Sequence, residues 1–122
     1  MDIKMKLLLL LALALSPVVF AITPPNLDAY QQPQILSNWL LSRCAGKIST
    51  DKAFTDDAYK SASAWLERSH LPIEAFNDGD RLISDYLKMK LSGADKSNLN
   101  MMKCTLLAQS QDAMEIFEKY NK

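Results

Sequence analysis

The residues that most often carry out chemistry in proteins are few in this chain. It has two cysteines, Cys44 and Cys104, and a single histidine, His70, which lies at a predicted helix break where a side chain is usually solvated. Asp78 and Asp80 are two positions apart, so on a helix their carboxylates point in different directions and form no catalytic pair. No phosphate-binding, metalloprotease, nucleophile-elbow or haem-attachment motif occurs. The sequence therefore predicts a protein that is not an enzyme and needs no cofactor or metal.

The first 21 residues have the features of a secretory signal peptide. Lys4 and Lys6 form a basic start, an apolar run follows from Leu7 to Leu15, and Ala21 supplies a small residue for cleavage. That run is too short for a stable membrane span, and no lipid-attachment cysteine ends it. We therefore expect cleavage after Ala21, export from the cytoplasm and no membrane anchor.

Export makes a disulfide bond the simplest role for the two cysteines. Neither Cys44 nor Cys104 belongs to a C-x-x-C motif that would tune a thiol for exchange. A bond between them closes a loop of about 60 residues, which the chain-entropy model values at about 4 kcal/mol. For one small domain this is a large share of the typical net stability, so we predict a structural disulfide.

The charge balance of the exported chain is close to neutral. The whole sequence has 14 basic and 14 acidic residues, and removal of Lys4, Lys6 and Asp2 with the signal leaves 12 basic and 13 acidic residues. Such a balance favours neither nucleic acid nor an anionic membrane as a partner. The remaining residues, 22–122, suffice for one domain with a modest core.

The apolar spacing predicts an all-α protein, a compact bundle of about five helices in a single domain over residues 33–122. Residues 22–32 lack this periodicity and are expected to form an extended N-terminal arm. We expect Pro33 in the first turn of the first helix, Asp51 or Thr55 at the start of the second, Pro72 at the start of the third, Ser97 or Asn98 as the cap of the fourth, and Ser110 just before the last.

The helical faces can also be predicted from the spacing. Leu36, Leu40 and Cys44 form a stripe with Ile35 and Trp39 beside it. Further apolar positions are Phe54, Ala58, Ala62, Trp65 and Leu66 in the second helix, Ile73, Phe76, Ile83, Tyr86 and Leu87 in the third, and Leu99, Met102 and Leu106 in the fourth. Gly79 interrupts the third stripe, and either close helix contact or a kink explains it.

Three stretches resemble the immunity proteins of type VI secretion amidase effectors. Together they cover most of the exported chain in the order found in that family: LSRCAGKIS, SASAWLERSHLPIEAFNDGDRLISDYL and NLNMMKCTLLAQSQDAMEIFEKY. The resemblance implies an all-helical, dimeric inhibitor in the periplasm. Its partner would be a peptidoglycan amidase with a Cys-His active site, whose cleft it blocks without modifying the enzyme.

The resemblance also extends to single positions. Cys44 and Cys104 match the cysteine pair of the family. After the second cysteine, relatives tend to carry an acidic and an aromatic residue, whereas this chain has Thr105-Leu106-Leu107-Ala108. This departure leaves open which amidase is the partner.

A candidate effector-binding element is the polar stretch between the third and fourth helices. Residues Leu91–Asn98 are predicted to form the longest interior loop. Its central residues are Ser92, Gly93, Ala94, Asp95, Lys96 and Ser97. Loops on rigid scaffolds often carry recognition, although such a stretch is also typical of a plain solvated connector. On the third helix Arg81, Asp85 and Lys88, spaced at i, i+4 and i+7, share an outer face that could flank it or simply be solvated.

Two other functions remain open from the sequence. Periplasmic acid-stress chaperones can also be small, helical and stapled by one disulfide, and an orphan helical binding domain would look similar. The small side chains of Ser61-Ala62-Ser63-Ala64 permit close helix approach, either in the core or in the homodimer that the resemblance implies.

Overall fold

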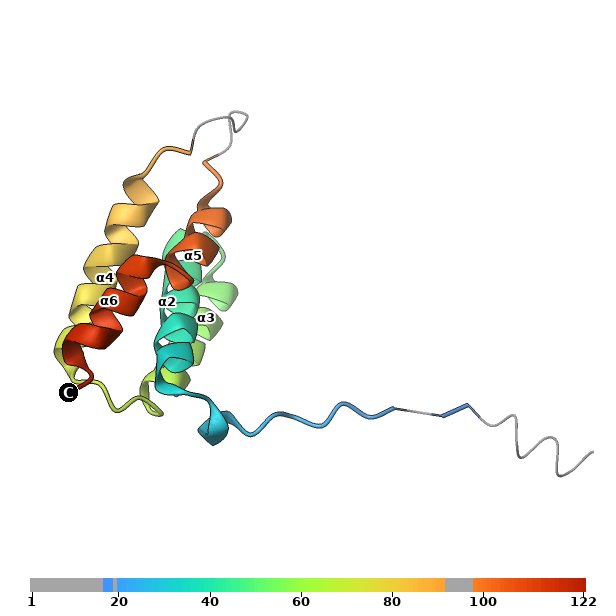
Figure 1. Ribbon diagram of the computed structural model, residues 1–122. Coiled ribbons are helices and arrows are strands. Elements are labelled where there is room, and N and C mark those ends of the chain that lie inside the picture. The colour runs from blue at the N-terminus through green and yellow to red at the C-terminus, as the bar shows by residue number, and fades with distance from the viewer. Residues whose placement is uncertain (1–16, 19, 92–97) are drawn as a thin grey trace, which may run out of the picture.

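The computed structural model describes residues 17, 18, 20–91 and 98–122, which form one helical domain (Figure 1). Its elements are a short 3-10 helix η1 (Leu27–Ala29) and the α-helices α2 (Gln32–Ile48), α3 (Lys52–Leu66), α4 (Ile73–Lys88), α5 (Asn100–Ala108) and α6 (Gln111–Tyr120). No strand occurs in these ranges, so the expected all-α bundle of about five helices is confirmed. Within the same ranges, none of the helices has the length and apolar character that crossing a membrane requires.

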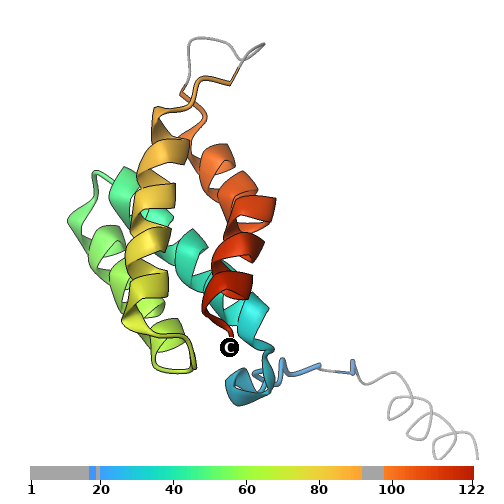
Figure 2. The ribbon, with the colours of Figure 1, turned by 60° about the vertical axis from the view of Figure 1, so that its left-hand side comes forward.

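Helix α2 is the centre of the bundle. It packs against α3, α4, α5 and α6 (Figures 1 and 2). Its buried residues include the consecutive Cys44, Ala45 and Gly46, and three residues at 100° intervals cannot lie on one narrow stripe. The predicted core positions are all buried: Ile35, Leu36, Trp39, Leu40 and Cys44. The second half of α2 is therefore enclosed over a broad arc by its neighbours.

The predicted helix starts agree with the structure in four of five cases. Pro33 lies in the first turn of α2, and Pro72 directly precedes α4. The side chain of Asp51 caps α3 by accepting a hydrogen bond from the backbone amide of Phe54 at 2.9 Å. The hydroxyl of Ser110 caps α6 in the same way, accepting from the backbone amide of Ala113 at 3.0 Å. These caps satisfy amides that have no partner inside their own helix.

The start of α5 differs from the prediction. The residue before the helix is Leu99, in the left-handed region with φ 50° and ψ 42°, and no side chain caps the first turn. Asn98 is thus not the cap that the sequence suggested, and Ser97 lies outside the described residues. A left-handed conformation is unusual for a residue with a branched side chain.

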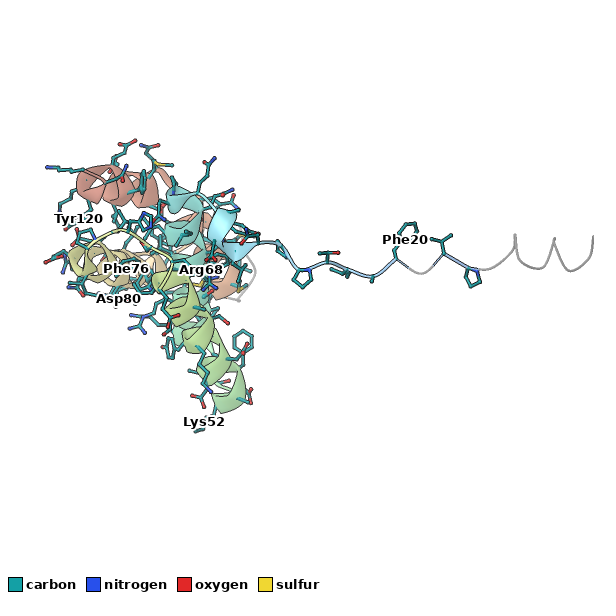
Figure 3. All side chains as sticks on the ribbon, turned by 90° about the horizontal axis from the view of Figure 1, so that it is seen from below. Phe20, Lys52, Arg68, Phe76, Asp80 and Tyr120 are labelled. Carbon is teal, nitrogen blue, oxygen red and sulfur yellow. A yellow bond between two sulfur atoms is a disulfide. The ribbon has the colours of Figure 1, made fainter. Side chains whose placement is uncertain are left out.

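The expected N-terminal arm is partly attached to the bundle. Residues 20–26 are exposed and without helix, and Phe20 lies far from the domain in Figure 3. Nearer the bundle the chain forms η1, and the ring of Tyr30 packs edge-on against Trp65 of α3 with centroids 5.3 Å apart. The side-chain amide of Gln32 accepts a hydrogen bond from the backbone N–H of His70 and donates one to the backbone carbonyl of Arg68. The arm is thus fixed where it meets the bundle.

Some predicted apolar faces are only partly buried. Phe54 and Ile73 are more than half exposed because they lie at the first turns of α3 and α4. Helix α3 packs only on α2 among the described elements, and its first residue, Lys52, lies at its outer tip in Figure 3. In α5, Met102 and Leu106 are about half exposed, whereas the next residues along, Lys103, Cys104, Leu107 and Ala108, face the interior.

Gly79 marks a close contact between α4 and α2 rather than a kink. Helix α4 continues through it without interruption. A Cβ atom added there would lie 2.8 Å from Cζ3 of Trp39 and 3.1 Å from Cδ2 of Leu40. One turn earlier in α4, Phe76 also contacts Trp39, with its ring edge-on and the ring centroids 4.9 Å apart.

We predict that Gly79→Ala destabilises the domain. Overpacking a dense core costs about 1–3 kcal/mol, which exceeds the gain of about 1 kcal/mol from the better helix former. Gly46→Ala is the comparison variant. Its Cβ would lie 2.6 Å from Cε1 of Tyr59, but that ring is only half-buried and has more room to shift than the buried Trp39. Thermal unfolding followed by circular dichroism should give a lower Tm for Gly79→Ala than for Gly46→Ala, and the reverse order would contradict this.

Candidate functional site

The two cysteines lie together in the core. Cys44 of α2 and Cys104 of α5 form a disulfide with a Cα–Cα distance of 5.6 Å, and both are fully buried. The predicted pairing is confirmed. Because a buried disulfide offers no thiolate to a substrate, these cysteines serve the scaffold.

The bond places α5 beside the end of α4, where the candidate effector-binding stretch begins. Figure 1 shows these helix ends opposite the C-terminus of the chain. The six central residues of the stretch, Ser92, Gly93, Ala94, Asp95, Lys96 and Ser97, lie outside the described residues. The structure describes the flanking residues, 89–91 and 98–99, and these lie at one end of the bundle.

The outer face of α4 is placed as the spacing suggested. Arg81, Asp85 and Lys88 are all exposed. The Arg81 guanidinium pairs with the carboxylate of Asp78 one turn earlier. Asp85 and Lys88 form no ion pair with any residue of the described ranges. Two of the three predicted flanking side chains are therefore available to a partner, and the third is partly engaged within α4.

An open groove of about 330 Å³ separates this face from α6. Asp85 lines it from α4, and Asp112 and Glu115 line it from α6. The phenol of Tyr86 donates a hydrogen bond to Asp112 at 3.0 Å and so holds the first turn of α6 against the last turn of α4. The groove is shallow and charged, unlike the enclosed, mostly apolar pockets that bind small molecules.

Asp78 holds the other end of α6. Its carboxylate accepts hydrogen bonds from the Tyr120 phenol at 2.7 Å and from Nζ of Lys119 at 3.1 Å. The hydrogen bond from Tyr120, and then that from Lys119, lowers the pKa of Asp78 below its usual value. The same contact, with Asp78 as the main cause, raises the pKa of Lys119.

Asp80 points the opposite way from Asp78, as its spacing predicted. Its carboxylate accepts from the Arg43 guanidinium of α2 at 3.0 and 3.3 Å, and Lys47 lies at 3.6 Å. The hydrogen bond from Asp80 raises the pKa of Arg43. The two carboxylates thus join α4 to α6 on one side and to α2 on the other.

One residue at this end of the bundle was missed by the sequence analysis. Lys103 is only 5% exposed, and its Nζ donates to the carbonyl of Leu87 at 3.3 Å and to Oδ1 of Asn100 at 3.4 Å. A charged residue next to a core cysteine was the available signal, because residues adjacent on a helix are only 100° apart.

The single histidine of the chain, His70, is exposed. Across residues 17, 18, 20–91 and 98–122, no three histidine, cysteine or acidic side chains gather as metal ligands would. A hollow of about 230 Å³ between α2 and α6, more enclosed than the groove between α4 and α6, is lined by apolar and uncharged side chains such as Leu36, Met114 and Phe117. What the structure offers is a rigid helical surface.

Comparison with known proteins identifies this architecture. The sequence profile described as "Tai4: Type VI secretion system (T6SS), amidase immunity protein" matches residues 34–117, nearly the whole bundle. The chain belongs to the Tai4 family. No match was found among curated protein sequences. Family membership favours an immunity protein over the acid-stress chaperone and the orphan helical domain.

Solved structures agree with the Tai4 assignment. The chain matches one in the crystal structure of the effector Tae4 from Salmonella typhimurium in complex with the immunity protein Tai4 from Enterobacter cloacae, with 40% identity and a TM-score of 0.72 over 78% of this chain and 98% of that one. A chain of the Tae4/Tai4 system of Salmonella typhimurium is 28% identical, with a TM-score of 0.70 over 80% and 96%. A chain from a structure described as new type VI-secreted toxins and self-resistance proteins in Serratia marcescens is 25% identical. The match has a TM-score of 0.71 and covers 84% of this chain and 86% of that one.

The lowered pKa of Asp78 predicts how its contact with α6 responds to acid. A carboxyl whose pKa is lowered by folding adds stability above its unfolded pKa, and that stability is lost as the pH falls through the native pKa. Asp78→Asn should therefore lower Tm at neutral pH. The difference in Tm from the wild type should stay constant down to about pH 4 and shrink below it.

Thermal unfolding of both proteins between about pH 7 and about pH 2.5 measures this difference. Asp57→Asn is the control, because Asp57 is exposed and its replacement should change Tm little at any pH. A difference between wild type and Asp78→Asn that does not change over the whole range would show that the carboxylate of Asp78 contributes nothing through its charge.

Proposed function

We propose that this protein binds and inhibits a peptidoglycan amidase effector of the Tae4 type in the periplasm. The observation that carries the proposal is the match of both sequence profile and fold to Tai4, which was crystallised in complex with Tae4. These matches cover 96–98% of the Tai4-related chains from Enterobacter and Salmonella structures. The chain therefore retains the whole bundle that those complexes contain.

The location in the periplasm is supported by two further observations. The first 21 residues have the pattern of a cleavable signal peptide. The buried disulfide between Cys44 and Cys104 is of the kind that forms and persists in oxidising compartments. The toxin would act on the cell wall in the same compartment, so inhibitor and enzyme meet there.

The helical surface of the bundle supports inhibition by contact. An amidase cleft is narrow, and a rigid scaffold blocks it best with an element that projects from one end. We propose that residues 92–97 are this element. The helix ends on both sides of them are fixed, α4 by its packing on α2 and α6, and α5 by the disulfide.

Replacing residues 92–97 with a plain Gly/Ser linker should weaken amidase binding by more than tenfold, which is about 1.4 kcal/mol. Central contacts dominate binding energy, whereas helicity and Tm should hardly change because the replacement leaves every helix and buried residue that the structure describes unaltered. Affinity can be measured by calorimetric titration with Tae4 from Enterobacter cloacae, and protection can be measured as growth of cells that export the amidase.

The control variant is His70→Ala. His70 is exposed in the connection before α4, and the 16 residues of α4 place that connection about 24 Å from its other end. Wild-type affinity is expected for this variant. Full protection by the linker variant would show that the inhibitory surface lies elsewhere, with the outer face of α4 (Arg81, Asp85, Lys88) as the next region to test.

We also propose that the protein is a homodimer. The resemblance to dimeric relatives supports it, and so does the exposure of Ser63 and Ala64, the half of the small-residue patch that α2 does not cover. Light scattering of the exported protein at tens of micromolar should give twice the mass of one chain. Ser63→Arg should shift that mass toward the monomer if the patch lies in the interface, and a monomeric wild type would refute the dimer itself.

A further inference from the structure

Among the α-helices that the structure describes, α5 alone exposes no charged side chain. Its single charged residue, Lys103, is buried. The exposed half of α5 consists of Met101, Met102, Thr105 and Leu106, and the exposed Gln109 continues it directly after the helix. Each of the other four α-helices exposes at least one charged residue: Lys47 in α2, Lys52 in α3, Arg81 in α4 and Glu115 in α6. We call this uncharged surface of α5 and Gln109 the α5 face.

The α5 face carries large apolar side chains next to one another. Met101, Met102 and Leu106 are 48%, 51% and 47% exposed. Phe54 and Ile73 are similarly exposed, but each lies alone at the first turn of its helix. The core of a protein interface is enriched in Met and depleted of charged residues. The α5 face therefore has the composition of a surface that another protein covers.

The α5 face ends at the apolar hollow between α2 and α6. Gln109 and Met114 line this hollow and are exposed, so they lie at its rim. None of the residues that line it is charged. Its volume of about 230 Å³ is below the roughly 300–1,000 Å³ of small-molecule pockets and well above the roughly 30 Å³ that one water occupies. The hollow therefore suits a single apolar side chain.

The spacing along α5 makes this face complementary to itself. Met102 precedes Gln109 by seven residues, or two helical turns, so the two lie on one side of α5 about 10 Å apart along its axis. When a second copy lies antiparallel along the face, a two-fold axis beside Thr105 and Leu106 brings Met102 of each copy to Gln109 of the other, at the rim of the hollow. Each copy then gives one methionine and receives one, as an isologous interface requires.

The side chains suit the positions that this pairing gives them. Met is flexible and polarizable, so it adapts to an irregular hollow and packs well beside an aromatic ring such as that of Phe117. Thr105 is small, which lets the two helices approach near the axis, where Leu106 of each copy packs. No like charges meet, because the face has none. Pairing through the outer side of α6 would instead bring Asp112 and Glu115 of both copies together.

We propose that the α5 face is the surface through which two copies of this protein associate, with Met102 of each in the hollow of the other. The inference rests on the homodimer proposed above and names its interface. It favours α5 over the small-residue patch of α3, because Ser63 and Ala64 offer little apolar surface and are flanked one turn away by the exposed Lys60 and Glu67. A helix of nine residues is only about 14 Å long, so we expect a small interface and a dimer that dissociates on dilution.

The test is Leu106→Glu in the exported protein with its disulfide intact. The change places two carboxylates beside the two-fold axis, so association should weaken about thirtyfold or more, as it does for residues at the centre of other interfaces. Light scattering at tens of micromolar should give twice the mass of one chain for the wild type and the mass of one chain for the variant. The Tm of the monomer should change little, because Leu106 is half exposed.

Two further variants separate the α5 face from exposed apolar residues in general. Ile73→Glu is the matched control, since it makes the same kind of change in an exposed apolar residue of α4 and should leave the dimer intact. Met102→Ala removes the side chain that enters the hollow without adding charge, and should weaken association about tenfold. A dimer that both α5 variants leave intact would overturn the proposal.

Cross-linking tests the antiparallel register. Thr105→Cys adds one exposed thiol beside the two-fold axis in each copy, while Cys44 and Cys104 are bonded to each other and buried. A short bismaleimide should therefore join two copies of this variant. Ser63→Cys carries its thiol on α3 and should stay uncross-linked at the same concentration. The reverse result would place the interface on the small-residue patch.

The outcomes distinguish failure of this inference from failure of the proposed dimer. A monomeric wild type refutes the dimer and the interface together. A dimer that Leu106→Glu leaves intact and Ser63→Arg dissociates refutes only this interface. A Leu106→Glu variant that stays dimeric but loses affinity for Tae4 from Enterobacter cloacae would overturn the proposal by showing that the α5 face binds the amidase instead.

Discussion

The disulfide between α2 and α5 is the constraint on which the rest of the structure depends. Helix α5 has nine residues, too few to be stable alone in water. Its disulfide bond to the second half of α2, together with the hydrogen bond from the Ser37 hydroxyl to its last residue, makes α5 part of the core. Because α6 follows after two residues, the position of α5 also decides where α6 meets α4. The disulfide thereby links α2 and α5 covalently wherever conditions are oxidising.

Helix α4 is connected to its neighbours by side chains that lie in opposite directions. Asp80 accepts a hydrogen bond from Arg43 of α2, whereas Asp78 and Tyr86 form hydrogen bonds to the two ends of α6. Gly79 lies between the two aspartates and lets α4 approach Trp39 closely. Polar contacts at the edges and a tight apolar contact in the middle fix both the distance and the rotation of α4. The outer face with Arg81, Asp85 and Lys88 is consequently held in one orientation, which a recognition surface requires.

Much of this could be predicted from the sequence because it depends on local rules. Helical spacing gave the five helices, proline and capping residues gave most of their starts, and export with two cysteines gave the disulfide. The errors fall where tertiary contacts override local preference. No local rule indicates that Leu99 adopts a left-handed conformation before α5, or that α5 turns Lys103 inward and Met102 outward. The hydrogen bonds of Tyr120 to Asp78 and of Tyr86 to Asp112 join residues 42 and 26 positions apart, respectively, which spacing within a helix cannot reveal.

The four residues after Cys104, Thr105 to Ala108, lie in two different environments. Leu107 and Ala108 are buried against the bundle, so a change there must keep the volume of the core. Thr105 and Leu106 are exposed on the same helix, next to Met101 and Met102. An acidic or aromatic residue at either exposed position would change the charge and shape of the surface without disturbing the disulfide. The structure thus separates the residues of α5 that maintain the core from those whose side chains are exposed.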